Sequence, residues 1–181
     1  MRIVAGQWRG RVLSAPSGTI TRPTADRVRQ ALFDILLHAP WAGRACVDGA
    51  VVLDVFAGTG AMGLEALSRG AARAMFIEQD RAALASLRAN IAACRAEERC
   101  LVLAMDMGQV PTGEAASLVF LDPPYGMGLI GAALARLRSV GRIAPGALVV
   151  AEMGRDEAAL DMETLAERTH GGARVTVWRE G

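Results

Sequence analysis

Residues 53–60 are Leu53-Asp54-Val55-Phe56-Ala57-Gly58-Thr59-Gly60, an apolar stretch that carries one acid and ends in two glycines. The apolar residues Val51–Phe56 predict a buried strand, and residues 61–68 predict the helix that follows it. Glycines at such a turn let a ligand approach the backbone closely and permit conformations that other residues disfavour. The segment therefore indicates a cofactor loop between a strand and a helix.

The chain after residue 68 continues to alternate apolar strands with helices. Further strands are expected at residues 74–77, 101–104, 118–121 and 147–152, further helices after residue 80 and at 129–137, and a terminal hairpin at 164–170 and 174–179. Continuous apolar strands separated by helices are typical of a parallel sheet that is covered on both faces. We therefore expect an α/β fold whose ligands bind beyond the carboxyl ends of the strands.

The first 30 residues carry a concentration of positive charge. They contain six arginines and one acid, a balance of +5, whereas the whole chain has a net charge of +1. Residues 2–13 suggest a short strand pair or arm, residues 15–23 a loop, and the following residues a helix that Thr24 can cap. The basic end is either a nucleic-acid contact or an ordinary solvated surface.

Several protein classes are excluded by composition. No apolar run reaches the roughly 18 residues that a membrane span needs, and residues 1–6 lack the apolar stretch of a signal peptide. The three cysteines form no paired motif and the two histidines are isolated, so neither a disulfide framework nor a metal site is indicated. We therefore expect a cytoplasmic protein that binds no metal.

The cofactor loop admits two interpretations. The spacing Gly58-x-Gly60-x-x-Gly63 fits a dinucleotide fingerprint, and Glu78 lies about where a ribose-binding acid belongs. Asp54 favours S-adenosylmethionine instead, because a carboxylate would repel a pyrophosphate but can hold the cationic methionine end. Glu78 would then accept the ribose hydroxyls, and Asp106 or its backbone neighbours would contact the adenine amine. The predicted cofactor residues are Asp54, Phe56, Ala57, Gly58, Gly60, Glu78, Gln79, Asp106 and Met107.

The segment Asp122-Pro123-Pro124-Tyr125 follows another predicted strand and indicates the catalytic group. Two prolines remove two N–H donors, so the segment presents carbonyls and cannot continue as sheet. An exocyclic amine on a base is a poor nucleophile, because its lone pair is delocalised into the ring. Acceptors at the Asp122 carboxylate and the Pro123 carbonyl would turn that lone pair toward a methyl donor and disperse the developing charge. Tyr125 can stack on an unstacked base.

Three further motifs resemble a known family. They are residues 1–11 (Met-Arg-Ile-Val-Ala-Gly-Gln-Trp-Arg-Gly-Arg), residues 22–29 (Arg-Pro-Thr-Ala-Asp-Arg-Val-Arg) and residues 63–70 (Gly-Leu-Glu-Ala-Leu-Ser-Arg-Gly). With residues 122–125, they resemble the bacterial 16S rRNA guanine-N2 methyltransferase family (RsmD). The resemblance implies a Rossmann-like class I methyltransferase domain at residues 24–181, with a mostly parallel seven-stranded sheet, and an N-terminal basic β-hairpin extension at residues 1–23.

The resemblance also implies the substrate, the N2 amine of a guanine in 16S rRNA of a small ribosomal subunit that already carries proteins, with S-adenosylmethionine as methyl donor and a monomeric enzyme. In the family, the segment at 22–29 lies beside the cleft, which implies contacts to phosphate or to the methionine carboxylate; helix capping and salt bridges are the alternative. The expected RNA-binding residues are Arg9, Arg11, Arg22, Thr24, Arg27 and Arg29.

Other functions stay open on the residues alone. The tetrapeptide also suits adenine-N6 methylation of DNA or RNA, so guanine follows from the resemblance alone. A non-catalytic RNA-binding or ribosome-assembly factor would have no need for residues 122–125. A nicotinamide-dependent dehydrogenase would need a hydride-transfer site, and neither histidine lies at an obvious strand end.

Overall fold

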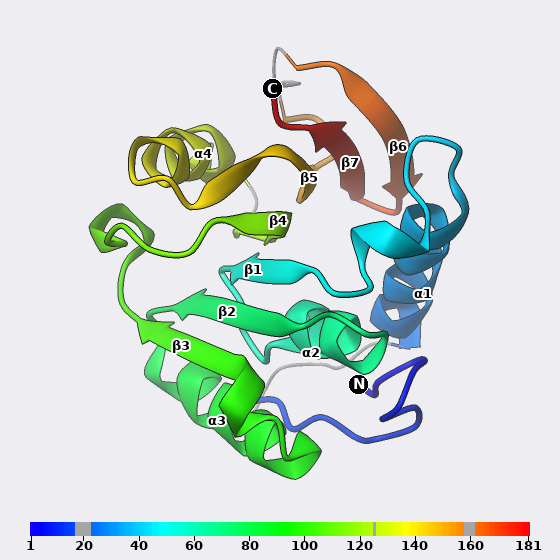
Figure 1. The fold of residues 1–181 in the computed structure, drawn as a ribbon, viewed down its shortest axis with the longest axis vertical. Helices are drawn as coiled ribbons and strands as arrows, with labels where there is room; N and C mark the ends of the chain where they lie inside the picture. The colour runs from blue at the N-terminus through cyan, green and yellow to red at the C-terminus, as the bar shows by residue number, and fades with distance from the viewer. Residues whose placement is uncertain (17–22, 125, 158–161) are drawn as a thin grey trace.

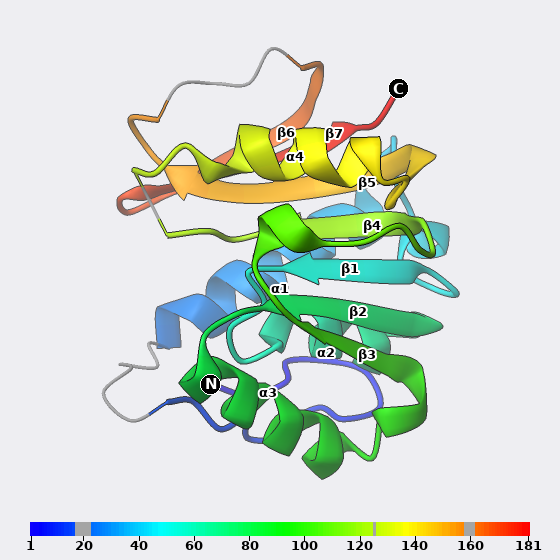
Figure 2. The ribbon, with the colours of Figure 1, turned by 90° about the vertical axis from the view of Figure 1, so that its left-hand side faces the viewer.

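The computed structural model describes residues 1–16, 23–124, 126–157 and 162–181, which form a seven-stranded sheet with helices on both faces (Figures 1 and 2). The sheet order is β3-β2-β1-β4-β5-β7-β6. Strands β1 to β5 pair in parallel, whereas β7 is antiparallel to both of its neighbours. The strands are β1 (Val51–Val55), β2 (Arg73–Glu78), β3 (Cys100–Ala104), β4 (Ala116–Leu121), β5 (Ile143–Gly154), β6 (Thr164–His170) and β7 (Ala173–Arg179).

The helices divide between the two faces of this sheet. They are α1 (Pro23–His38), α2 (Ala61–Ser68), α3 (Arg81–Cys94) and α4 (Leu129–Ser139), with short 3-10 turns η1 (Arg44–Cys46), η2 (Glu97–Arg99) and η3 (Met107–Gln109). Side chains of β1 alternate between two cores: Val52 packs with α1, α2 and α3, whereas Leu53 and Val55 pack with α4. The predicted α/β sheet with two covered faces is confirmed. Among the described helices, none is long and apolar enough to cross a bilayer.

The strand order reverses between β1 and β4. The chain passes from β1 outward through β2 to β3 and then returns to place β4 on the other side of β1. Connections leave in opposite directions at such a point, so a crevice forms beyond the carboxyl ends of the two strands. The glycine loop follows β1 and the proline segment follows β4, so the fold brings these two predicted motifs to the same edge.

The starts of α1 and β5 are among the boundaries that differ from the expectations. Helix α1 begins at Pro23, so Thr24 lies inside its first turn and is not the cap; proline suits this first position because its missing N–H has no helical partner there. Strand β5 begins at Ile143, four residues before the predicted start, and its pairing with β4 shifts register between Ala116 and Leu118.

The N-terminal arm, residues 1–16, forms a turn with few ladder contacts. Its one isolated bridge joins Arg2 and Val12 in antiparallel orientation. The Ile3 N–H donates to the Arg11 carbonyl at 2.9 Å, and the Leu13 N–H donates to the Met1 carbonyl at 3.0 Å. Ile3 and Leu13 are buried in the same core as α1 and α2, so the arm is packed onto the sheet's helical layer.

Candidate active site

A cavity of about 570 Å³ lies at the carboxyl edge of the sheet. Its volume falls in the usual range for small-molecule sites, about 300–1,000 Å³. Seven predicted site residues line it together with Asp80 and a group of apolar side chains. The lining residues are Phe56, Ile77, Glu78, Gln79, Asp80, Met105, Met107, Asp122, Pro123, Pro124, Met127 and Leu129. The glycines of the loop are not among these lining residues. The cavity therefore joins the end of β2 to the proline segment after β4.

Glu78 is fixed by backbone donors at the end of β2. Its Oε2 accepts from the Gly58 N–H at 2.8 Å, and its Oε1 accepts from the N–H groups of Gln79 and Asp80, each at 2.8 Å. The carboxylate thus ties the glycine loop to the start of α3. Of the roughly four lone-pair sites of a carboxylate, Oε1 has both of its sites filled and Oε2 retains one. Glu78 can therefore accept a hydroxyl donor from a ligand at Oε2 without losing its orientation.

Asp54 lies beneath the loop and is not among the residues that line this cavity. Its carboxyl group is buried, and Oδ2 accepts from the Gly63 N–H of α2 at 2.9 Å. The pKa of Asp54 is raised to about 8, chiefly by burial; the hydrogen bond from Gly63 opposes this shift, and the carboxylates of Asp122 and Glu78 contribute to it. The sequence placed Asp54 against a cationic ligand; its contact in the structure is the first turn of α2.

The loop between β1 and α2 holds an unusual backbone. Phe56 lines the cavity with a φ of 59°, a left-handed conformation that bulky residues rarely adopt and that occurs often at functional sites. Gly58 has open space where a Cβ would project, whereas a Cβ on Gly60 would lie 2.3 Å from Leu87 Cδ1. The predicted role of close ligand approach therefore suits Gly58, and Gly60 is required for packing against α3.

The surroundings of Asp122 raise the pKa of its carboxyl group toward neutral pH. It follows β4 directly, lines the cavity and is reached by solvent there, but the protein packed around its carboxyl group restricts hydration. This desolvation raises the pKa of Asp122 to about 7, and the nearby Glu152 carboxylate contributes in the same direction. Pro123 is buried and Pro124 exposed. Tyr125 lies outside the described residues.

Glu157 is a residue that the sequence did not indicate. Its Oε1 accepts from the Gly126 N–H at 2.6 Å and from the Gly154 N–H at 3.1 Å. These hydrogen bonds, led by that of Gly126, lower the pKa of Glu157, and the charge of Arg174 adds to the effect. The carboxylate thus links the residue after Tyr125 to the end of β5. No motif marks Glu157, because its role depends on a contact across 31 positions.

The residues after the third strand contribute methionine side chains to the cavity wall. Asp106 does not line the cavity; its Oδ1 accepts from the Gly108 N–H at 2.8 Å and caps the η3 turn. Met105 and Met107 on either side line the cavity wall. In the described part of the chain, no group of three or more histidine, cysteine, aspartate or glutamate side chains lies close enough to hold a metal ion.

The predicted RNA-binding arginines fall into two groups. Arg9, Arg11 and Arg27 are exposed, and Arg11 donates to the Ala93 carbonyl at the end of α3. Arg29 is only 4% exposed and is used inside the protein. Of the two roles left open for it, the structure shows the salt bridge. Arg22 lies outside the described residues, as does the side chain of Thr24.

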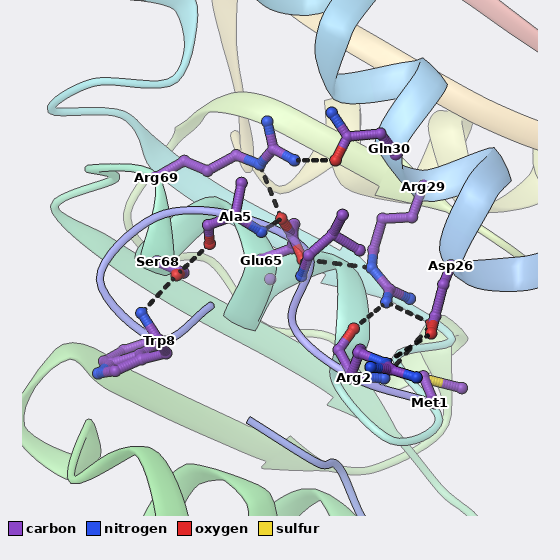
Figure 3. A network of polar contacts seen from close by, with 12 residues as sticks. Met1, Arg2, Ala5, Trp8, Asp26, Arg29, Gln30, Glu65, Ser68 and Arg69 are labelled. Carbon is purple, nitrogen blue, oxygen red and sulfur yellow. Dashed lines mark hydrogen bonds and ion pairs between the residues drawn. The ribbon is translucent and has the colours of Figure 1, made fainter. Parts of the chain in front are cut away.

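A buried carboxylate organises the arm around Arg29, as Figure 3 shows. Glu65 of α2 is 0% exposed and accepts from the N–H groups of Val4 at 2.8 Å and Ala5 at 3.0 Å. It also accepts from Arg29 Nε at 3.4 Å and from Arg69 Nε at 2.8 Å. The helix that begins at the glycine loop therefore also holds the basic arm.

Comparisons with known proteins identify the family of this chain. The model of a family described as conserved hypothetical protein 95 matches residues 1–179. Ribosomal RNA small subunit methyltransferase D of Escherichia coli strain K12 is 42% identical over 153 residues, which cover 84% of this chain and 74% of that protein. The protein of the same name from Haemophilus influenzae is 34% identical over 180 residues, which cover 94% of this chain and 89% of that protein.

Solved structures show the same fold. The structure of yhhF from Escherichia coli has a TM-score of 0.85 and 35% identity, and covers 99% of this chain and 97% of its own. At 20% identity and a TM-score of 0.60, an RNA methyltransferase from Salinibacter ruber shares the fold over 84% of this chain and 90% of its own; it is in complex with S-adenosyl-L-homocysteine. S-adenosylmethionine is the methyl donor of this enzyme class. The chain therefore belongs to the family described as conserved hypothetical protein 95, the RsmD family of bacterial small-subunit rRNA methyltransferases.

Proposed function

We infer that this protein transfers a methyl group from S-adenosylmethionine to the exocyclic N2 amine of a guanine in 16S rRNA. The observation that carries the chemistry is the position of Asp122, Pro123 and Pro124 on the wall of a cavity that Glu78 also lines. The family identity supplies the substrate class, since its relatives are named as small-subunit rRNA methyltransferases.

The lining of the cavity fits S-adenosylmethionine. Glu78 offers a fixed acceptor at Oε2 for a ribose hydroxyl, and Ile77, Met105 and Met107 offer an apolar surface suited to an adenine ring. Gly58, held by Glu78, lets the backbone approach the donor closely. Asp54 contributes by fixing Gly63 and hence the start of α2, so its role is to shape the loop. When bound, S-adenosylmethionine supplies an electrophilic methyl group.

The proline segment prepares the amine for transfer. The Asp122 carboxylate and the Pro123 carbonyl accept the two amine hydrogens, which aims the nitrogen lone pair and disperses the positive charge that develops on nitrogen. Asp122 then takes the proton that the methylated amine releases. A pKa of about 7 suits this task, because a group titrating near the working pH can both receive and return a proton. Tyr125 stacks on the base in this proposal.

Recognition of the RNA is assigned to the exposed arginines. Arg9 and Arg11 of the arm and Arg27 of α1 are available to phosphate oxygens, whereas Arg29 is committed to Glu65 and Asp26. Contacts of this kind supply affinity and position without reading sequence. We propose that the assembled small subunit in the cytoplasm is the partner, that the enzyme acts as a monomer, and that residues 1–23 form an extension of the domain at 24–181.

The Asp122→Ala variant tests the catalytic assignment. We expect it to bind S-adenosyl-L-homocysteine with wild-type affinity in calorimetry, because Glu78 and the glycine loop are unchanged. Transfer of radiolabelled methyl groups to small subunits from a strain lacking this protein should fall by at least about 100-fold. Wild-type transfer rates in this variant would remove Asp122 from the mechanism.

The modified nucleoside tests the substrate assignment. Mass spectrometry of digested 16S rRNA after reaction should show N2-methylguanosine. Formation of N6-methyladenosine would instead establish the adenine-N6 activity that the proline segment also permits.

A further inference from the structure

Helix α3 has a basic outer face that the chemistry above does not use. Arg81, Arg88 and Arg95 recur at intervals of seven residues, and all three are exposed. Seven residues complete nearly two helical turns, so the first two project from the same side of the helix, and Arg95 directly follows its last turn. An adjacent side of the helix packs into the core through Leu84, Leu87, Asn90, Ile91 and Cys94.

These arginines form no ion pair with a described carboxylate, although Glu97 and Glu98 of η2 lie two and three residues after Arg95. Helix α3 contains neither aspartate nor glutamate. Its N-cap, Asp80, uses its carboxylate to accept from the Ala83 N–H. A row of such arginines produces a positive potential along the helix, which attracts polyanions.

The row connects the cavity with the basic arm. Arg81 follows Asp80, a residue of the cavity wall. From Arg81 to Arg95 the helix rises about 21 Å, at about 1.5 Å per residue. At the far end, Arg11 donates to the Ala93 carbonyl. Figures 1 and 2 show the arm running beside α3 at this edge of the molecule.

We propose that Arg81, Arg88 and Arg95 form a track for the sugar–phosphate backbone of the RNA strand that delivers the target base to the cavity. The inference rests on the proposed function and extends it to the route of the substrate. Guanidinium groups suit this partner because their planar donors match phosphate oxygens bidentately. Successive arginines lie about 10 Å apart along the helix, so a single extended strand can contact all three through separate phosphates.

A triple variant, Arg81→Gln, Arg88→Gln and Arg95→Gln, tests the track. Glutamine keeps the side chain long and suits a helix, so the fold should survive. We expect the KM for small subunits to rise about 10- to 100-fold at physiological salt, with kcat at saturating substrate and S-adenosyl-L-homocysteine affinity unchanged. The slope of log affinity for 16S rRNA against log salt should decrease in magnitude by about 2, since each lost phosphate contact accounts for about 0.7 to 0.9.

The matched control removes the same charge elsewhere. Arg44, Arg73 and Arg168 are exposed and belong to η1, β2 and β6, so their triple glutamine variant should keep the wild-type KM and salt slope. If both triple variants showed the same rise in KM and the same change in salt slope, net charge alone would explain the effect, and the proposed track would be overturned. An unchanged KM and salt slope in the α3 variant, or a loss confined to kcat, would overturn it as well.

Failure of the proposed function gives a different result. If the proposed function were wrong, the wild-type protein itself would methylate no small subunit, and no variant would be needed to see this. The salt dependence of 16S rRNA binding by the wild type and the α3 variant would still decide whether the track exists.

Discussion

Replacing Glu65 by alanine is expected to destabilise the protein by about 4 kcal/mol. The side chain is fully buried, and its two cationic partners, Arg29 and Arg69, are 4% and 6% exposed. Removing one member of a buried ion pair costs about 3–5 kcal/mol, because the remaining charge is left without compensation. Arg29 retains Asp26 and Arg69 retains Gln30, which keeps the expected loss near the middle of this range.

The assay is urea unfolding with linear extrapolation, with Glu114→Ala as the matched control. Glu114 also pairs with an arginine, Arg73, but the two side chains are 43% and 58% exposed, and such pairs contribute about 1 kcal/mol or less. Amide hydrogen exchange at Val4 and Ala5 should accelerate in the Glu65 variant only, since both donate to its carboxylate. A loss no larger than that of the control would refute the reasoning, because the burial of the network would then carry no energetic weight.

Three further predictions concern Asp122 and the contact between Glu157 and Gly126. Because desolvation raises the pKa of Asp122 from 3.8 to about 7 and the ionised form is the acceptor, kcat/KM should rise with pH to a plateau above about 7. The same shift favours the protonated acid in the folded state, so the free energy of unfolding falls as pH increases from about 4 to 7. Asp122→Asn, which does not titrate, should therefore gain stability relative to wild type over that interval. A difference in urea midpoints that does not change with pH would contradict this. Glu157→Ala should lower kcat/KM for small subunits by about 10- to 100-fold, because it releases Gly126 beside the base-binding residue, and the exposed Glu163→Ala should not. Unchanged kcat/KM in the Glu157 variant, measured beside S-adenosyl-L-homocysteine affinity, would assign this contact to structure alone.

Local patterns predicted most of the fold. The helix at 61–68 and the strand at 164–170 have the predicted bounds, and the other elements of the sheet differ from the prediction mainly at their ends. These elements combine strong apolar periodicity with glycine or proline at their boundaries. The predicted start of α1 was wrong by two residues, since a proline and a threonine both suit helix starts and the pattern cannot order them.

The candidate site was predictable where chemistry and chain position coincide. Glu78 and Asp122 follow strands directly, so the parallel topology places both in one crevice. Asp54 bonds the Gly63 N–H, and a side chain at Gly60 would meet Leu87, so both positions also serve the packing of the loop, which the motif alone does not show. A linear motif cannot tell a residue that touches a ligand from one that shapes the loop around it.

Contacts between residues far apart in the chain could not be predicted from the sequence patterns. Glu65 lies in a segment that matches the family, yet nothing in that segment shows that its carboxylate receives donors from residues 4 and 5. Arg29 was expected to contact phosphate or to form salt bridges, and only its burial decides between them. Both residues are charged and lie on helices, so their local pattern is that of a solvated face.

The Glu65 network has a consequence for how substrate and cofactor are arranged. Helix α2 begins directly after Gly60 of the cofactor loop, and Asp54 fixes its first turn through Gly63. One turn later the same helix holds the arm through Glu65, and the arm in turn contacts α3 through Arg11. A short, buried helix transmits position far better than a solvated loop, because packed interiors deform little. Helix α2 therefore fixes the position of the basic arm relative to the cofactor loop. Loss of Glu65 should lower the affinity for RNA more than it lowers the affinity of the cavity for its ligand.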